Sequence, residues 1–458
     1  MSVLVIADDL WSRLRDHLLA DREERAGFLL ARSAGPRLIV RDLVLIPDDQ
    51  LERGTDSVSV TPPALVDVMN RAVREDMIIV EAHSHPQSWE TVRFSDLDDQ
   101  GQREMVVYLA DVMPGRTYGA IVVGQSAVAG RLWHGRRWTP LDHVLVTGPH
   151  IELWSGDGSP MTRNSRASVR HSDRYDRQVR AFGQEGQSKI ARCRVAVVGE
   201  GGIGSIVTVQ LAHLGVRDIA LIDADRVEES NLNRLAGATP SDVGQLKVDL
   251  AEVQFRRVSP VASICSVPEE IRTESALEAA QSADVLFGCV DTDSGRLILN
   301  ELAVTHAIPY IDCGSGIDAP DGRMSAAGGQ VVVWVPGRPC LLCCGEIDRA
   351  IAAEELESED LRAFRRGRGY ISGSDTPEPS VISLNGTVAS LAVTEFIALL
   401  TGFRPANHYT YYDMFNQRVG QRLVKRNPLC FTCSTEGTGD SANVKRYSRI
   451  AVPMDLPA

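Results

Sequence analysis

The chain has 458 residues, of which 43% are hydrophobic and 24% charged, and its formal net charge is −13. This composition is typical of a globular protein with two or three domains, and the acidic excess excludes nonspecific binding to nucleic acid or to anionic membranes. The first twenty residues are too charged for a signal peptide, and no uninterrupted apolar run of spanning length is evident, so we expect a cytoplasmic protein with no membrane or nucleic-acid partner.

Residues 1–145 predict a mixed α+β domain. An apolar stripe at residues 10–18 predicts a helix, and residues 27–32 and 38–46 have the pattern of strands. The apolar run at residues 77–80 predicts a buried strand that leads into the first histidine motif of the chain.

The remainder predicts a linker, an α/β domain and a tail. Residues 146–172 are mainly polar, with recurring Gly, Ser and Arg, which favours a linker. Residues 173–435 alternate apolar strand patterns with helix patterns, which predicts a parallel sheet wound by helices on both faces. One of these helices is expected at 242–256. Residues 436–458 are polar and are expected to form a loosely ordered C-terminal tail.

Two histidines and an aspartate form a candidate metal site. His83 and His85 lie two positions apart after the predicted strand, where both imidazoles can face one point. Asp98, in a helix that Ser95 opens, could add a carboxylate oxygen and leave the fourth tetrahedral position of a zinc ion for water. Glu24 is the candidate general base, and Ser95 could both cap the helix and donate a hydrogen bond to an oxyanion.

Taken alone, the histidines could equally be turn residues and Ser95 only a helix cap. The combination of HxHP, a following SxxD and an upstream ExxG resembles the JAB/JAMM (MPN) metallopeptidases over roughly residues 1–140. The resemblance implies a zinc isopeptidase acting after ubiquitin-like modifiers, with Glu24 as acid/base, the two histidines and the aspartate as ligands, and Ser95 supporting the oxyanion. Nine residues separate His85 from Ser95 where the family usually has seven, which affects the fine geometry.

A glycine-rich turn, GEGGIG, follows the predicted strand at residues 195–198. Its glycines are Gly199, Gly201, Gly202 and Gly204. In a strand–turn–helix context, such glycines let backbone amides approach phosphate at a helix N-terminus. Asp223 and Asp225 follow the next predicted strand, where they are placed to bind ribose hydroxyls. This pattern alone would equally suit a nicotinamide dehydrogenase.

Five further polar residues argue against hydride transfer. They are Arg177, Asn231, Arg234, Lys247 and Asp291. Singly, each is more often a solvated side chain. Together they suit attack of a carboxylate on the α-phosphate of ATP, because charge on the triphosphate and on the departing pyrophosphate must be neutralised.

In this order, over residues 174–433, these residues resemble the ThiF-type, ubiquitin-activating-enzyme-like adenylyltransferases. The resemblance implies a Rossmann-like doubly wound domain that uses ATP and Mg²⁺. Its expected partner is a ubiquitin-like or sulfur-carrier protein ending in Gly-Gly, whose terminal carboxylate it adenylates.

The same resemblance implies roles for individual side chains. Asp225 would hold the ribose, with Asp223 beside it, and Asp291, expected at the end of a strand over residues 284–290, would bind magnesium. The phosphate contacts would come from Asn231, Arg234 and Lys247. Arg177 would reach into the partner subunit as an arginine finger, which implies a homodimer. Glu200 departs from the family pattern, because an acid beside phosphates is unfavourable unless it points away.

Two CxxC pairs predict a second, structural zinc site. The cysteines are Cys340, Cys343, Cys430 and Cys433. Four thiolates at this spacing suit a closed site, and the resemblance implies that this zinc fastens the crossover segment to the sheet. Cys344 is not expected to be a ligand.

Many relatives pass the adenylate to a cysteine in the crossover segment, but no cysteine lies between Gly345 and Leu429. We therefore expect direct transfer to a sulfur donor, an amine or a separate conjugating enzyme. Cys313 is the remaining candidate nucleophile, although a small buried residue is the favoured interpretation. Ser374 and Ser380 in the crossover segment have no evident base nearby.

The leading hypothesis therefore combines adenylation of a modifier with zinc-dependent cleavage after it. Two alternatives stay open. One is sulfur-carrier activation for cofactor or natural-product biosynthesis only. The other is a nonenzymatic scaffold with degenerate MPN and ThiF folds.

Overall fold

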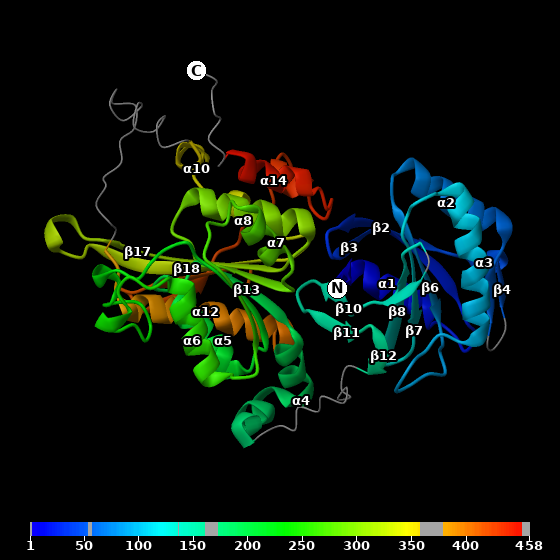
Figure 1. Ribbon diagram of the computed structural model, residues 1–458, viewed down its shortest axis with the longest axis horizontal. Coiled ribbons are helices and arrows are strands. Elements are labelled where there is room, and N and C mark those ends of the chain that lie inside the picture. Colours follow the sequence, from blue (N-terminus) through cyan, green and yellow to red (C-terminus); the bar gives the residue numbers. More distant parts are fainter. Residues whose placement is uncertain (1, 54–56, 136, 161–172, 358–378, 451–458) are drawn as a thin grey trace. The chain divides into compact units, whose positions relative to one another are not determined.

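The computed structural model describes residues 2–53, 57–135, 137–160, 173–357 and 379–450 (Figure 1). The chain divides into two compact units. Unit one comprises Met1–Ser172 with Gly437–Gly439, and unit two comprises Asp173–Glu436 with Asp440–Ala458.

Unit one is built on a ten-stranded mixed sheet. Its strand order is β11-β10-β1-β3-β2-β6-β7-β8-β12, and β9 pairs with β8. The strands are β1 (Val3–Ala7), β2 (Ala26–Ala34), β3 (Arg37–Leu45), β6 (Ile78–Ser84), β7 (Tyr118–Val123), β8 (Ala127–Trp133), β9 (Trp138–Pro140), β10 (His143–Thr147), β11 (Glu152–Ser155) and β12 (Asp157–Pro160). A separate hairpin pairs β4 (Leu51–Arg53) with β5 (Val58–Val60).

Alternation of side chains along the strands gives unit one a core on each face of its sheet. On β2, Leu29 packs with Trp11 and Leu14 of helix α1 (Asp8–Leu18). The neighbouring Phe28 faces the other way, toward helices α2 (Pro62–Arg74) and α3 (Asp96–Val112), whose Met69 and Leu109 belong to the second cluster. Successive side chains of a strand point to opposite faces, so one strand serves both cores.

Unit one extends further along the chain than the sequence predicted. The expected linker over residues 146–172 contains β11 and β12, which pair with β10 and β8. Leu153 and Trp154 are buried, so the polar composition concealed a short strand that closes the edge of the sheet. The rest of that expected linker, residues 161–172, lies outside the described residues.

Unit two has an eight-stranded sheet in the order β15-β14-β13-β16-β17-β18-β19-β20. The strands are β13 (Arg194–Val198), β14 (Asp218–Ile222), β15 (Ser263–Val267), β16 (Val285–Gly288), β17 (Tyr310–Asp318), β18 (Ala326–Trp334), β19 (Tyr409–Asp413) and β20 (Arg418–Gln421). Pairing is parallel from β15 to β17 and antiparallel from β17 to β20. The predicted doubly wound, Rossmann-like α/β architecture of this unit is confirmed, with an antiparallel extension.

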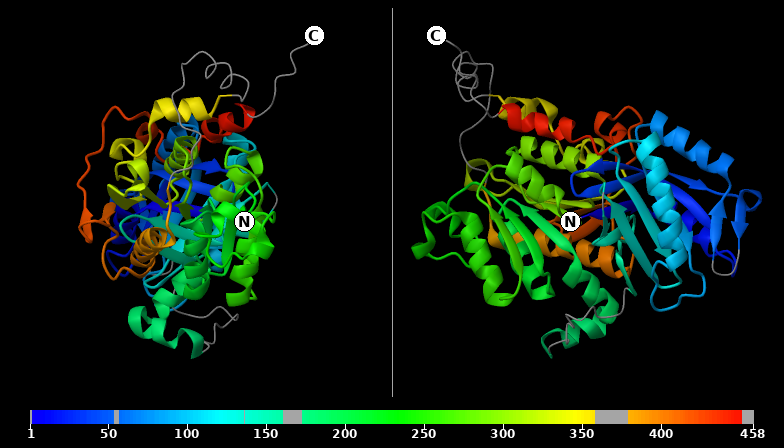
Figure 2. Two further views of the ribbon diagram at one scale, coloured as in Figure 1. Left: turned by 90° about the vertical axis from the view of Figure 1, so that its left-hand side faces the viewer. Right: turned by 45° about the vertical axis from the view of Figure 1, so that its right-hand side comes forward.

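Helices cover both faces of this sheet, as Figures 1 and 2 show. One face carries α4 (Asp176–Arg192), α5 (Gly204–Leu214), α6 (Lys247–Val258) and α12 (Ile382–Thr401). The other carries α7 (Glu274–Gln281), α8 (Asp293–His306), α10 (Arg349–Glu355) and α14 (Ser441–Ile450). Two one-turn helices, α9 (Leu341–Cys344) and α13 (Phe431–Ser434), carry cysteines.

Helix α12 is long and mainly apolar, although Asn385 and Glu395 interrupt its apolar residues. Its mean hydropathy is 1.5 over its most apolar window. By length and composition alone, the helix could cross a membrane. It packs against β17, β18 and α5, and Leu384, Val388 and Phe396 are buried. A core helix that lies on a sheet is apolar for the same reason, because most of its surface is removed from water.

Three other boundaries differ from the sequence predictions. Helix α6 begins at Lys247 instead of residue 242, because Gly244 adopts a left-handed φ of 91° in the preceding turn. Strand β16 ends at Gly288, before Asp291. The expected loose tail contains α14, whose buried Tyr447 donates a hydrogen bond to Glu301 at 2.8 Å.

Candidate functional sites

The glycine-rich turn lies at the carboxyl end of β13, between β14 and β16. At this position the order of the parallel strands reverses, and open α/β sheets bind ligands in the crevice that results. Gly199 has a φ of 91°, and its backbone amide donates to the carbonyl oxygen of Ile222 at 2.8 Å. A Cβ on Gly204 would lie 1.8 Å from the carbonyl oxygen of Gly199. The tight turn into α5 therefore requires glycine at both positions.

Glu200, the acid inside this turn, points away from the crevice. Its side chain is 1% exposed, and both carboxyl oxygens lie within hydrogen-bonding distance of Oγ1 of Thr208 on α5, at 2.9 and 3.1 Å. Burial raises the pKa of Glu200 to about 8, although the Thr208 hydroxyl opposes the shift. The group is therefore protonated at neutral pH and places no negative charge in the turn.

Asp223 and Asp225 follow β14 next to the same turn. Oδ2 of Asp223 accepts from the backbone amide of Glu200 at 2.7 Å, and Oδ1 accepts from the amide of Asp225 at 2.8 Å. Asp225 is exposed, and its Oδ2 accepts from Nζ of Lys247 at 2.6 Å. The structure thus joins the expected ribose residue directly to an expected phosphate residue.

Asn231 and Arg234 occupy a short turn between β14 and α6. Asn231 is buried, its Oδ1 accepts from the amide of Glu228, and its Nδ2 donates to Oγ of Ser230. Nη1 of Arg234 donates to the carbonyl oxygen of Ser230 at 2.7 Å. The Arg234 side chain also lies against the glycine turn, since a Cβ on Gly202 would be 3.5 Å from its Cδ.

Asp291 and Arg177 lie on separate elements. Asp291 is exposed just before α8. Arg177 is exposed in the first turn of α4, and within the described parts of the chain no hydrogen bond or ion pair joins it to the glycine turn.

Asn385 is a contributor to this site that the sequence analysis missed. It lies on α12 and is 2% exposed. A Cβ on Gly202 would lie 2.3 Å from its Nδ2, so the amide occupies the space that the missing side chain leaves. Its Oδ1 accepts from Oγ of Ser315, and its Nδ2 donates to Oγ of Ser380. The sequence offered only a weak signal, an asparagine in a mainly apolar helix that also holds other polar residues.

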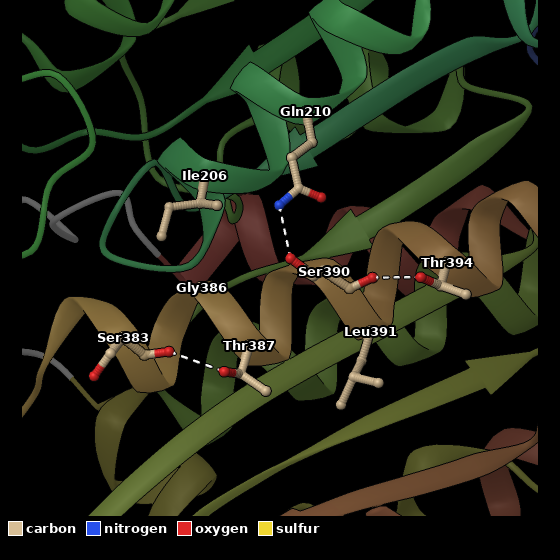
Figure 3. A pocket seen from close by; sticks show the side chains of 8 residues that line it. All are labelled: Ile206, Gln210, Ser383, Gly386, Thr387, Ser390, Leu391 and Thr394. Carbon is tan, nitrogen blue, oxygen red and sulfur yellow. Dashed lines mark hydrogen bonds between the residues drawn. The ribbon is translucent and has the colours of Figure 1, made fainter. Parts of the chain in front are cut away.

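The groove in Figure 3 is separate from these residues. It has a volume of about 560 Å³ and is formed by α5 and α12, where Nε2 of Gln210 donates to Oγ of Ser390 at 3.0 Å. No residue of the expected nucleotide or metal sites lines it.

The four cysteines of the CxxC pairs converge between α9 and α13. The separations of their sulfur atoms are 3.9 Å for Cys340 and Cys343, 3.5 Å for Cys340 and Cys430, and 3.7 Å for Cys343 and Cys433. Thiolates bound at about 2.3 Å to one tetrahedral zinc lie about 3.8 Å apart. The donor set and its spacing therefore fit a closed zinc site.

The other singled-out thiols lie elsewhere. Cys344 is buried, with its sulfur 3.5 Å from Nε2 of His408. Cys313 is 1% exposed and its sulfur lies 3.4 Å from that of Cys289. This environment suits a packed residue better than a nucleophile, because the buried sulfur is covered from any substrate. Ser374 lies outside the described residues.

In unit one, strand β6 and helix α3 bring His83, His85 and Asp98 together. Nε2 of His83 lies 3.1 Å from Oδ1 of Asp98, and Nε2 of His85 lies 3.4 Å from Oδ2. Burial disfavours charge on Asp98, but the two flanking histidine rings outweigh it and hold the pKa of this carboxyl well below its usual range. The carboxylate is therefore in its ionised, metal-binding form.

This arrangement also fits a metal. Ligands about 2.05 Å from a tetrahedral zinc lie about 3.3 Å apart, close to the separations of these three side chains. Among the described residues, no hydrogen bond is found for either ring nitrogen of the buried His83, and Nε2 has only the ion-pair contact with Asp98 at 3.1 Å. Buried imidazole nitrogens without partners are costly, and a bound cation would satisfy one of them.

Glu24 and Ser95 flank this cluster. Glu24 lies just before β2 and is buried, with Oε1 at 3.5 Å from Nε2 of His85. Ser95 caps α3, since its Oγ accepts from the amide of Asp98 at 3.1 Å while Oδ2 of Asp98 accepts from the amide of Ser95. Because Oγ acts there as an acceptor, the hydroxyl hydrogen can still be donated to another group.

The chain is similar in sequence to known proteins over somewhat more than half of its length. The sulfur carrier protein adenylyltransferase of Thermus thermophilus is 29% identical over 271 residues, which are 58% of this chain and 92% of that protein. The SAMP-activating enzyme E1 of Haloferax volcanii is 26% identical over 62% of this chain and 96% of its own length. The molybdopterin-synthase adenylyltransferase of Salmonella typhimurium is 30% identical over 57% of this chain and 95% of its own length.

The model of the ThiF family matches residues 175–432, which begin just before α4 and end within α13. The matched region contains the glycine turn and the Asp225 and Lys247 pair beside it. It also contains three of the four cysteines of the CxxC pairs, all except Cys433. Since this match covers more than half of the 458 residues, the chain belongs to the ThiF family.

Proposed function

We propose that unit two adenylates the C-terminal carboxylate of a ubiquitin-like or sulfur-carrier protein ending in Gly-Gly. The observation that carries the proposal is the Lys247 and Asp225 pair beside a glycine turn at the strand-order reversal. The names of the relatives support it, since they describe adenylyltransferases and an activating enzyme for such carriers.

In this reaction an oxygen of the carrier carboxylate attacks the α-phosphorus of ATP, and pyrophosphate leaves. Asp225 would bind the ribose, so Lys247 would exchange its carboxylate partner for phosphate oxygens when ATP enters. Arg234, with Asn231 fixing its turn, would add a second contact to the phosphates. Asp291 would hold Mg²⁺, which neutralises charge on the triphosphate.

The proposed product is an acyl-adenylate that is passed on without a crossover thioester. The crossover segment offers no cysteine, and Cys313 is buried. An acyl-adenylate already has AMP as a good leaving group, so a sulfur donor, an amine or a conjugating enzyme can attack it directly. We further propose a homodimer in which Arg177 of each chain reaches the partner subunit.

We propose that unit one is a zinc hydrolase of the JAB/JAMM type that cleaves the peptide or isopeptide bond after the same carrier. The separations of His83, His85 and Asp98, with Glu24 beside them, support this assignment. Zinc bound there would polarise the scissile carbonyl and acidify water. Glu24 would take the proton of the attacking water, and the Ser95 hydroxyl would donate to the oxyanion.

The test of the first proposal is ATP–pyrophosphate exchange by the purified chain with small carrier proteins that end in Gly-Gly. Carrier-dependent and magnesium-dependent exchange supports adenylation. NAD reduction with a hydroxy acid, in place of exchange, would contradict it. For unit one, the test is release of a coumarin reporter amide-linked to the terminal glycine of the same carrier.

A further inference from the structure

Ser84 lies between the two histidines of the candidate metal site and contacts the loop that carries Glu24. It is the last residue of β6 and is fully buried. Its backbone amide donates to the carbonyl oxygen of Arg25 at 3.0 Å. Its Oγ in turn accepts from the backbone amide of Arg25, also at 3.0 Å. The side chain and the backbone of Ser84 thus bind both backbone polar groups of Arg25, the residue that follows Glu24.

The position of Arg25 and Ser84 in the sheet explains why a serine hydroxyl accepts the hydrogen bond from the Arg25 amide. Strands β2 and β6 are antiparallel, with Ala26 opposite His83, and β2 begins at Ala26. Arg25 and Ser84 are the next pair beyond the end of the ladder. A hydrogen-bonded antiparallel pair exchanges two backbone bonds. Here Oγ of Ser84 takes the place of the second backbone acceptor, so the pairing extends by one residue beyond β2.

Two further contacts hold the side chain of Arg25, the residue next to Glu24. The guanidinium of Arg25 lies 2.9 Å from Oδ2 of Asp21 and 2.9 Å from Oδ1 of Asp48. On the other side of Ser84, the amide of His85 donates to the carbonyl oxygen of Val123 on β7 at 3.0 Å. Ser84 is therefore the point where the loop of Glu24 and the anchored His85 are joined.

We infer that Ser84 is a positioning residue that sets the distance between Glu24 and the metal ligand His85. The two side chains lie 3.5 Å apart, with Glu24 one residue before Arg25 and His85 one residue after Ser84. This inference rests on the proposed hydrolase function of unit one. It predicts that loss of the Ser84 hydroxyl displaces Glu24 without removing a metal ligand.

The variants are Ser84→Ala, which removes the acceptor, and Ser84→Thr, which keeps it. Ser88→Ala is the matched control, since Ser88 lies in the turn that follows β6 and no side-chain hydrogen bond of Ser88 is found among the described residues. The full chain is used with the carrier–coumarin reporter. Ser84→Ala is expected to lower kcat tenfold or more with little change in KM, because a displacement of about 1 Å of a reacting group costs on the order of 10²-fold. Ser84→Thr, which keeps the hydroxyl, is expected to retain most of the wild-type kcat.

Two measurements separate positioning from loss of metal or fold. Zinc per chain should be the same in wild type, Ser84→Ala and Ser88→Ala. Hydrogen exchange in the peptide covering residues 20–28 should be faster in Ser84→Ala only, because the Arg25 amide loses its acceptor.

Unchanged exchange in Ser84→Ala, or failure of Ser84→Thr to restore turnover, would overturn the inference. Loss of zinc in Ser84→Ala would also overturn it, since the residue would then support the metal and not Glu24. A wild-type chain that holds zinc but releases no coumarin would contradict the proposed hydrolase and the catalytic part of this inference. The exchange result would still decide whether the hydrogen bond from Arg25 orders the loop.

Discussion

Glu200 and Thr208 form a buried hydrogen bond of 2.9 Å that joins the glycine turn to the first helix after it. The sequence left open whether the acid in this turn would face bound phosphates. It faces α5 instead, and a protonated carboxyl next to a hydroxyl can be buried without an ion partner. The glycine turn is thereby tied to α5 by a neutral contact.

Glu200 should make the stability of unit two depend on pH. Its pKa rises from 4.5 to about 8 on folding, so the folded chain binds one more proton than the unfolded chain between these values. This contribution to stability is complete below about pH 4.5 and is lost as pH rises through about 8. Glu200→Gln should flatten the decline of the melting temperature between about pH 4.5 and 8. At pH 9, where wild type has lost this contribution, the free energy of unfolding of Glu200→Gln and that of wild type should differ by on the order of a few kcal/mol more than at pH 4.5.

The control for this experiment is Glu229→Gln, because Glu229 is exposed in the neighbouring η3 turn, Glu229–Asn231. Burial also raises the pKa of Asp223, so part of the decline should persist in Glu200→Gln. An identical pH dependence in wild type and Glu200→Gln would contradict the assignment.

Purified protein should contain two zinc ions per chain. The four-cysteine ion should be held firmly, because closed thiolate sites exchange slowly, and the ion at the histidine site should be removed by mild chelation. His85→Ala should lose one equivalent and keep the other, as measured by elemental analysis. Loss of both ions, or of neither, would argue against two independent sites.

Lys247→Ala should lower the rate of ATP–pyrophosphate exchange by about 100-fold or more, because one positive charge is removed from the transition state. Asp291→Ala should abolish the magnesium-dependent rate. Lys425→Ala is a suitable control, since Lys425 is exposed near β20. Equal rates in Lys247→Ala and in the control would place the phosphate site elsewhere.

Mass spectrometry after incubation with ATP and carrier should find an acyl-adenylate. No adduct that reducing agents release should appear, because no cysteine lies between Gly345 and Leu429 and Cys313 is buried. A thiol-labile adduct on Cys313 would reverse its assignment as a packed residue. An oxyester on Ser374 or Ser380 would show that a hydroxyl had replaced the thiol.

Local spacing in the sequence determined the features that depend on neighbouring residues. Strand, glycine turn and helix follow one another at residues 194–214, so their geometry is set by backbone sterics over a few positions. The same is true of the capping box at Ser95 and Asp98. Alternating apolar segments likewise predicted the parallel, doubly wound sheet of unit two.

Only the tertiary structure decided features that depend on distant segments. Asn385 reaches the glycine turn from a helix about 180 positions later, and the strand β11 closes an edge although its sequence looks like a linker. Tyr447 folds the tail into α14 by reaching Glu301 on α8. The direction of Glu200 followed from the packing of α5. Such contacts gain their free energy from burial against surfaces that are formed elsewhere in the chain, so no local pattern records them.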